Sequence, residues 1–162
     1  MSEVRWLSED EMRTWRGFLS ASARVAELVE RDLQATSGRS AGEYEVLVHL
    51  SEAPNRRRRM ADLAEHSLLS RSRLTHTVDR LQRAGLVERE ACEDDRRGTW
   101  ARLTDEGLAH IEAIAPGHLR TVRRVLFDHL EPEEVRAMGD GFARVLAAMG
   151  ETPCPGTADP CG

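Results

Sequence analysis

Apolar residues recur with a helical period in the first part of the 162-residue chain. Over residues 8–36 this spacing predicts one long amphipathic helix. Ser8 followed three residues later by Glu11 has the spacing of a capping box, which marks the start of the helix. Ser37 and Gly38 are expected to end it. The apolar face of this helix would be formed by Trp15, Phe18, Leu19, Ala26, Val29 and Leu33.

A second capping box, Ser40 with Glu43, predicts another helix that carries Tyr44 and Leu47 and ends near Pro54. Four consecutive arginines at residues 56–59 follow, and we expect them in a loop. There they could contact phosphate or simply remain solvated, and the sequence does not decide between the two.

The middle of the chain predicts a helix-turn-helix with a wing. A short helix over residues 60–66 is followed by a turn, and Ser70 is placed to cap a second helix that runs to about residue 84. Gly85 would terminate that helix. Two short strands are predicted at residues 86–90 and 99–103. This order is that of a winged helix-turn-helix.

Two further helices complete a mostly α-helical fold with a small β-hairpin wing. Thr104 would cap a long helix that is kinked at Pro116 and then continues to about residue 129. Pro132 at a first-turn position would open a last helix that ends near Met149. The remaining tail is rich in Pro and Gly, so residues 150–162 are expected to be disordered.

The second helix of the helix-turn-helix separates cleanly into two faces on a helical wheel. Leu74, Val78 and Leu81 form one narrow stripe that should face the core. The opposite side carries Asp79 among hydrogen-bonding side chains, as expected of a helix that enters a DNA major groove. The candidate DNA-contacting residues on this helix are Ser70, Arg71, Ser72, Arg73, Thr75, His76, Arg80 and Arg83.

The net charge of −5 is unevenly distributed along the chain. Residues 54–104 contain 12 Arg against 8 acidic residues, a balance of +4, whereas the rest contains 11 Arg against 20 acids, a balance of −9. All the basic residues are Arg, whose planar guanidinium suits phosphate and guanine edges. A basic middle between acidic flanks favours DNA as the partner of the middle segment.

The segment between the two strands, residues 92–99, is a turn-forming run of acidic and basic residues. At the tip of a hairpin it could reach a minor groove, where the narrow groove's negative potential attracts an arginine. We therefore add Asp95, Arg96 and Arg97 to the candidate DNA-contacting residues, with Asp95 orienting the guanidinium of Arg97. A solvated hairpin tip is the alternative.

The run LLSRSRLTHTVDRLQRAGLVERE, followed by DDRRGTWARLTDEG, resembles the MarR family of bacterial transcriptional regulators. The resemblance covers about residues 8–149. It implies a homodimer that binds a pseudo-palindromic operator, with residues 70–83 in the major groove and Arg97 of the Asp95–Arg97 wing motif in the minor groove. It also implies that the first and last helices of the two subunits interleave.

The expected organisation is a single domain, residues 1–149, with the DNA-binding module at residues 40–104 and dimerisation helices at residues 8–36 and 105–149. Exposed apolar positions on long terminal helices support a dimer independently, because a compact winged module does not need these helices. The positions that need partners are Leu119, Val122, Leu126, Phe142, Val145, Leu146 and Met149.

Members of the MarR family, which this chain resembles, often release DNA on binding a small aromatic molecule. Candidate pocket residues here are Trp15, Arg16, Phe18, Leu19, Tyr44 and His49, although ordinary packing, or a surface position in the case of Arg16, is the simpler interpretation of each. A thiol-based sensor using Cys92, Cys154 or Cys161 is an alternative. The six histidines show no zinc-like spacing, so we expect no metal and no cofactor.

Other function classes are weaker. The chain has no phosphate-cradling glycine loop and no nucleophile motif, so we do not expect an enzyme. No apolar run is long enough to cross a bilayer, and no secretory signal is visible, which predicts a cytoplasmic protein without a membrane partner. The serious competitor is a winged helix that binds another protein instead of DNA.

Overall fold

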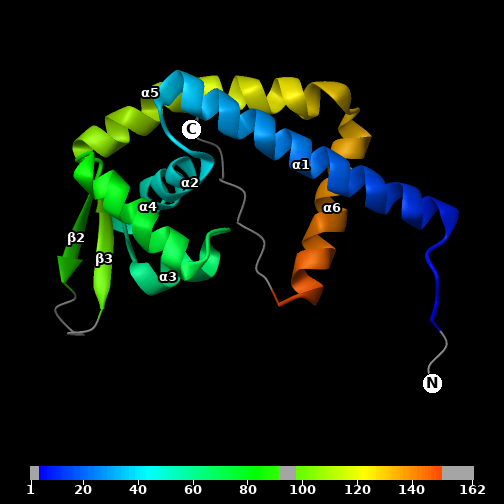
Figure 1. The fold of residues 1–162 in the computed structure, drawn as a ribbon, viewed down its shortest axis with the longest axis horizontal. Helices are drawn as coiled ribbons and strands as arrows, with labels where there is room; N and C mark the ends of the chain where they lie inside the picture. The colour runs from blue at the N-terminus through cyan, green and yellow to red at the C-terminus, as the bar shows by residue number, and fades with distance from the viewer. Residues whose placement is uncertain (1–3, 92–97, 151–162) are drawn as a thin grey trace.

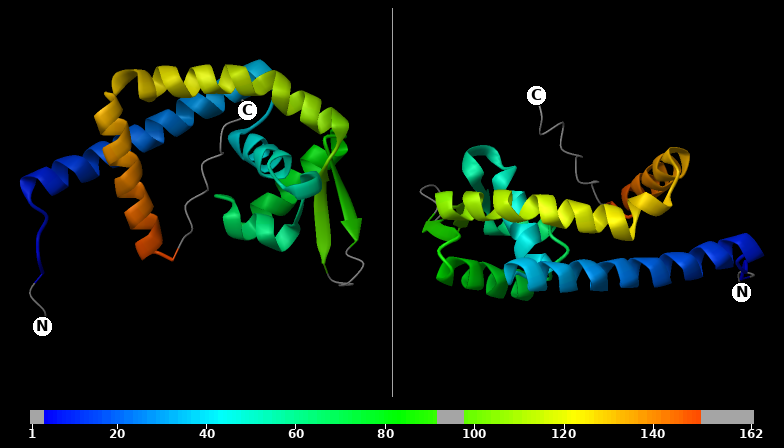
Figure 2. Two further views of the ribbon diagram at one scale, coloured as in Figure 1. Left: turned by 180° about the vertical axis from the view of Figure 1, so that it is seen from behind. Right: turned by 90° about the horizontal axis from the view of Figure 1, so that it is seen from above.

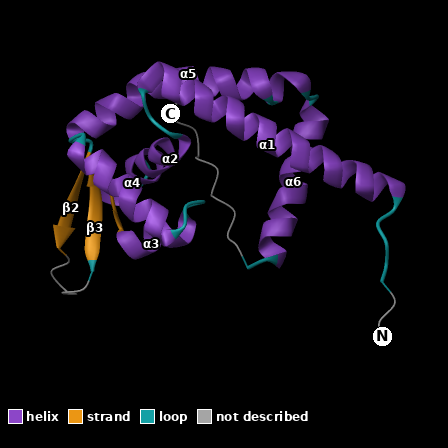
Figure 3. Cartoon of the chain, viewed as in Figure 1, coloured by secondary structure: helices purple, strands orange, loops and turns teal. Residues whose placement is uncertain are grey.

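The computed structural model describes residues 4–91 and 98–150, and these form a winged module with long helices extending from it (Figure 1). The fold is mostly helical, as predicted, with one small antiparallel sheet (Figure 3). In chain order the elements are α1 (Glu9–Ser37), α2 (Ala41–Ser51), the 3-10 turn η1 (Pro54–Arg56), β1 (Arg57–Arg59), α3 (Met60–His66), α4 (Arg71–Arg83), β2 (Val87–Ala91), β3 (Thr99–Leu103), α5 (Asp105–Val125), the 3-10 turn η2 (Phe127–His129) and α6 (Pro132–Ala148).

The helix starts follow the capping signals in the sequence. Ser8 and Ser40 each accept a hydrogen bond from the backbone amide three residues later, and the carboxylates of Glu11 and Glu43 accept one in return from the amide of the cap residue. Gly38 ends α1 in the left-handed region at φ +68°, a conformation that glycine adopts without a steric penalty. Both predicted capping boxes are therefore confirmed.

The sheet has three strands in the order β1-β3-β2, and the first of them corrects a sequence expectation. Three of the four arginines predicted to lie in a loop form β1, which pairs antiparallel with β3 so that Arg57 pairs with Arg102 and Arg59 with Trp100, while Arg56 ends the turn η1. The guanidinium groups of Arg57 and Arg59 lie 4.8 and 5.3 Å from the Trp100 ring centroid. Contact with a strand more than 40 residues away thus stabilises a segment that has no strand pattern of its own.

The core lies where α2, α3, α4, the sheet and the start of α5 meet. Apolar side chains from each of these elements are almost completely removed from solvent, which is the main stabilising contribution to a module of this size. The cluster consists of Val46, Leu47, Leu50, Leu63, Leu74, Val78, Leu81, Leu86, Val87, Ala101, Leu103 and Ile111.

The terminal helices extend away from this core. α1 and α5 lie side by side, and their far ends project well beyond the winged module (Figures 1 and 2). α6 turns away from the end of α5 and has no buried residue. Its contact with α1 includes the rings of Phe18 and Phe142, whose centroids are 5.9 Å apart. Large apolar side chains of α1, α5 and α6 remain exposed.

Several predicted boundaries move by a few residues. α2 ends at Ser51 and does not reach Pro54, and the strand predicted at residues 86–90 is observed as Val87–Ala91. α5 continues through Pro116 and changes direction part-way along (Figure 1), but it ends at Val125. Residues expected to extend this helix instead form the 3-10 turn η2.

The joint between the winged module and α5 is tight. The Thr104 hydroxyl donates to the carbonyl of Gly85 (2.8 Å) and, as the cap of α5, accepts from the amide of Gly107 (2.9 Å). A Cβ placed on Gly107 would lie 2.2 Å from the carbonyl oxygen of Leu86. Only glycine permits this approach of α5 to the backbone that leads into β2.

Candidate nucleic-acid interface

Helix α4 presents a basic, hydrogen-bonding face to solvent. Its inner stripe, Leu74, Val78 and Leu81, is at most 1% exposed, which confirms the wheel prediction. Thr77 is also buried, at 4%, and was not assigned to this stripe from the sequence. The outer face of α4 is exposed at Arg71, Ser72, Arg73, Thr75, His76, Arg80, Gln82 and Arg83.

The polar groups on this outer face differ in how firmly the protein holds them. The Thr75 hydroxyl donates to the carbonyl of Arg71 (3.0 Å), and Arg83 donates to the carbonyl of Asp79 (3.2 Å). Within the part of the chain that the structure describes, no ion pair holds Arg71 or Arg73. These two guanidiniums are therefore available to a phosphate or a base edge.

The N-terminal end of α4 is organised by two serines. Ser70 caps the helix by accepting from the amide of Arg73 (3.4 Å), and its hydroxyl lies 3.4 Å from that of Ser72. The unpaired amides of a helix N-terminus attract anions, so this end is suited to a phosphate. Ser70 thus has the predicted capping role.

Two carboxylates of α2 contact the helix-turn-helix on the side away from its exposed face. Glu43 is 5% exposed and lies 3.5 Å from Nε of Arg80 and 3.6 Å from Arg39. Glu45 accepts from the amide of Leu68 (2.7 Å) in the turn between α3 and α4. Burial disfavours the ionised Glu45, but hydrogen bonds from His49 and Leu68 outweigh this and hold its pKa below the usual range. Two side chains of α2 therefore contact α4 and the turn before it.

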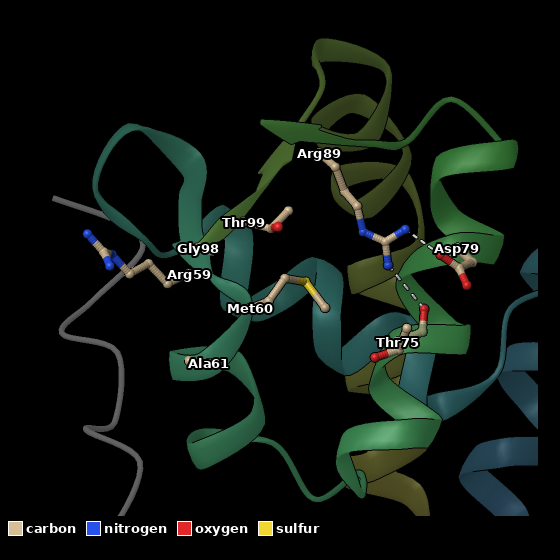
Figure 4. A pocket seen from close by; sticks show the side chains of 8 residues that line it. All are labelled: Arg59, Met60, Ala61, Thr75, Asp79, Arg89, Gly98 and Thr99. Atoms are coloured by element: carbon tan, nitrogen blue, oxygen red, sulfur yellow. Dashed lines mark hydrogen bonds and ion pairs between the residues drawn. The ribbon is translucent and has the colours of Figure 1, made fainter. Parts of the chain in front are cut away.

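A cleft of about 460 Å³ opens between α3, α4 and the base of the wing (Figure 4). It is lined by Arg59, Met60, Ala61, Thr75, Asp79, Arg89, Gly98 and Thr99. Across it, Arg89 of β2 is ion-paired with Asp79 of α4 and donates to the carbonyl of Thr75 (3.3 Å). The hydrogen bond from Arg89 and the positive charge of its guanidinium hold the pKa of the Asp79 carboxyl below the usual range. The helical period predicted Asp79 on the outer face of α4 but gave no sign of its pairing with Arg89.

The wing residues predicted to reach DNA, Asp95, Arg96 and Arg97, lie outside the described residues, as do the three cysteines and nearly all of the tail. What the structure does describe is the base of the wing, where β2 and β3 pair in register from Val87 with Leu103 to Ala91 with Thr99. Arg89 of β2 and Thr99 of β3, at this base of the wing, also line the cleft beside α4.

The residues proposed for an effector pocket fall into two groups. Trp15 and Phe18 stack with their centroids 6.0 Å apart, and Phe18 also contacts Phe142. Tyr44 instead packs on His118, with centroids 4.3 Å apart, and His49 lies 3.8 Å from Glu45. Arg16 and Leu19 are exposed on α1 beside the first group.

The two groups are far apart within one chain. Glu30 of α1 accepts from the amide of Ala41 at the start of α2 (2.6 Å), so α2 meets α1 near that residue. Trp15 lies 15 residues earlier on α1, about 22 Å along the helix at a rise of ~1.5 Å per residue. A single chain therefore does not assemble the six residues into one pocket.

Comparison with known proteins agrees with this geometry. A sequence profile of the MarR family matches residues 37–98, the segment that contains the helix-turn-helix. The HTH-type transcriptional repressor YetL of Bacillus subtilis is 32% identical over 114 residues, which cover 68% of each protein. The chain belongs to the MarR family.

Solved structures place nearly the whole MarR-family chain in the same fold. Sco3205, a MarR family transcriptional regulator from Streptomyces coelicolor crystallised in complex with DNA, is 40% identical, with a TM-score of 0.86 and 94% of each chain covered. AbsC from the same organism is 39% identical, with a TM-score of 0.84 over 91% of this chain and 99% of AbsC. The resemblance found in the sequence is confirmed: the protein is a DNA-binding transcriptional regulator and not an enzyme.

The remaining sequence expectations concern metals and membranes. Among the described residues, no group of three His, Cys, Asp or Glu side chains lies together as metal ligands would. In the same residues, no helix combines the length and the apolar character that crossing a bilayer requires.

Proposed function

We propose that the protein represses transcription by binding a pseudo-palindromic operator as a homodimer, with α4 of each subunit in a major groove. The outward face of α4 carries the proposal, because Arg71 and Arg73 extend from its N-terminal half without an ion-pair partner among the described residues. Residues Ser70, Ser72, Thr75 and His76 would provide base and phosphate contacts nearby, while Arg80 and Arg83 would reach the backbone. The name of YetL, a repressor, supports the sign of regulation.

The terminal helices support the homodimer. Phe142, Val145 and Leu146 on α6 and Trp15, Phe18 and Leu19 on α1 are each more than a third exposed, which leaves a large apolar surface uncovered in one chain. A second copy would cover it symmetrically and place two α4 helices about one DNA turn apart. In this arrangement residues 40–104 bind DNA, and residues 8–36 and 105–149 hold the dimer.

We also propose that a small aromatic molecule releases the operator. The aromatic side chains of α1 and the half-buried Tyr44 with His49 would provide apolar walls and polar anchors. Since one chain holds these groups apart, the site would combine α1 of one subunit with α2 of the other.

Selection of bound duplexes from a random-sequence library tests the central proposal. A repeated inverted half-site is expected, and Arg73→Ala should lower affinity for the selected duplex about tenfold or relax its sequence preference. Arg136→Ala on α6, also an exposed arginine, serves as the control and should bind as the wild type does. Failure to enrich any sequence would contradict sequence-specific recognition.

The wing is tested by Arg97→Ala, which should weaken operator binding while leaving the oligomeric state unchanged. Unchanged affinity in a gel-shift assay would remove the wing from the mechanism. A winged helix that binds protein would show no measurable affinity for random duplex at low salt, whereas a DNA reader should bind it with a steep salt dependence.

A further inference from the structure

We propose that Arg89 is a positioning residue that sets the angle between the recognition helix α4 and the wing, so that both can contact DNA at once. The proposal rests on the proposed function, because it concerns how α4 and the wing are presented together. It assigns Arg89 and Asp79 a role in DNA recognition without direct contact to a base.

Three contacts from one guanidinium carry the inference. Arg89 Nη1 pairs with the Asp79 carboxylate and donates to Oε1 of Gln82 (3.2 Å), while Nη2 donates to the backbone carbonyl of Thr75 (3.3 Å). These acceptors span two turns of α4. A planar guanidinium that contacts such a spread of acceptors restrains the rotation of the helix as well as its distance from the strand.

The strand register explains why Arg89 reaches α4. Arg89 pairs with Ala101, which is fully buried, so both side chains lie on the face of the sheet that covers the module. Glu88 and Glu90, on either side in the sequence, lie on the other face, where both bind Arg102. Arg89 is therefore the charged side chain of β2 that is directed at the recognition helix (Figure 4).

Val87 of β2 packs against α4 in the core, but at Arg89 the two elements border a cleft. The 460 Å³ cleft lies beside the contact, with Thr75 and Asp79 on one side and Arg89 and Thr99 on the other. Close-packed interiors transmit position directly, whereas elements across a cleft can shift unless a link spans it. The side chain of Arg89 is 25% exposed and that of Asp79 is 38% exposed, so solvent screens the pair less than a fully exposed one.

The negative charge of Asp79 means that the direction of the change in DNA affinity tests the proposal. A carboxylate on a DNA-reading helix repels phosphate, so removing it should strengthen binding if it has no other role. If Asp79 positions the wing through Arg89, removing it should weaken specific binding in spite of the lost repulsion. The two readings thus predict opposite changes in affinity.

The experiment uses the full chain and a duplex selected by the wild-type protein from a random library. Asp79→Ala and Arg89→Ala should each lower affinity for this duplex about tenfold, and the double variant should bind no worse than either single variant. Affinity for random duplex should fall much less with Asp79→Ala. The matched control is Glu65→Ala on α3, which removes one exposed acidic charge and should leave binding unchanged or slightly tighter.

Arg89→Lys separates positioning from a phosphate contact. Lys keeps the charge but cannot span the three acceptors, so it should bind nearly as poorly as Arg89→Ala, whereas a direct phosphate contact would be largely restored. Thermal unfolding should show that each variant is folded at the assay temperature. Asp79→Ala binding as tightly as the wild type overturns the positioning role, while absence of specific binding by the wild type itself overturns the proposed function.

Discussion

The winged module and the terminal helices bury their apolar side chains in different ways. In the module, helices and sheet from the same chain enclose a core in which Leu47, Leu63 and Leu81 have no exposed surface. In contrast, α6 has no buried residue, and Leu119 on α5 is 59% exposed. One chain thus completes the first core, and in the proposed homodimer its terminal helices would provide half of a second. Substitutions in the two regions should accordingly change different quantities: unfolding free energy in the module, and subunit association in the helices.

The largest expected effect comes from Leu81→Ala in the core of the module. Removing a fully buried leucine leaves a cavity and should lower the free energy of unfolding by about 2–5 kcal/mol. Urea denaturation at a fixed protomer concentration measures it. Leu68→Ala, at a leucine that is 96% exposed, is the control and should change stability by less than about 0.5 kcal/mol. Equal losses in both would contradict the core described here.

Phe142→Asp tests the role of the terminal helices. A charge placed in the apolar surface of α6 should weaken subunit association by about 2 kcal/mol or more, while circular dichroism retains a helical module. Sedimentation equilibrium would report a shift toward monomer and gel-shift assays a weaker operator complex. If the variant associates as the wild type does, Phe142 lies outside the interface.

Gly107→Ala tests the joint between the two regions. The added methyl group would meet the carbonyl oxygen of Leu86, so α5 or the start of β2 must move, at a cost of about 1–3 kcal/mol in unfolding free energy. Gly139→Ala in α6, where nothing lies within 4 Å of the new Cβ, is the matched control and should be neutral or slightly stabilising. Equal stability of the two variants would mean that the joint is loose.

The smallest effect concerns pH, through two histidines of α5. Burial lowers the pKa of His118 and of His110, and the nearby Arg39 lowers that of His110 further, while Asp32 partly opposes the shift at His118. Because the folded pKa lies below the unfolded one, the unfolded state takes up protons first as pH falls. Stability should therefore decline below about pH 6.5.

Urea denaturation at pH 7.5 and 5.5 measures this decline, and His118→Asn should reduce it. Leu68→Ala, which removes an exposed apolar side chain and no titratable group, is the control and should leave the pH dependence unchanged. A wild-type protein equally stable at both pH values would exclude a contribution from these histidines.

The sequence predicted those structural features that are determined by residues close together in the chain. Capping at Ser8 and Ser40 and the stripe formed by Leu74, Val78 and Leu81 follow from residues a few positions apart, and all of them are observed. The strand β1 was missed because three consecutive arginines carry no alternation, and their pairing with β3 and Trp100 is set by tertiary contact.

The site shows the same division. The outward residues of α4 were predictable from the helical period, but the pairing of Asp79 with Arg89 depends on how β2 packs against α4, which periodicity does not specify. Tyr44 and His118 are 74 positions apart in the chain, and only the packing of α2 against α5 brings their rings together. The reach of the wing tip stays a prediction from the sequence.

The close approach at Gly107 has a mechanical consequence. The 21 residues of α5 make a lever about 32 Å long, rigidly attached at one end to the base of the wing. A rotation of only about 10° about its far end would displace the attached module by about 5–6 Å. Such a shift is large compared with the length of a hydrogen bond between a side chain and a base. Because the joint at Gly107 does not absorb the tilt, a small rearrangement among the terminal helices would move the DNA-binding module by a larger distance.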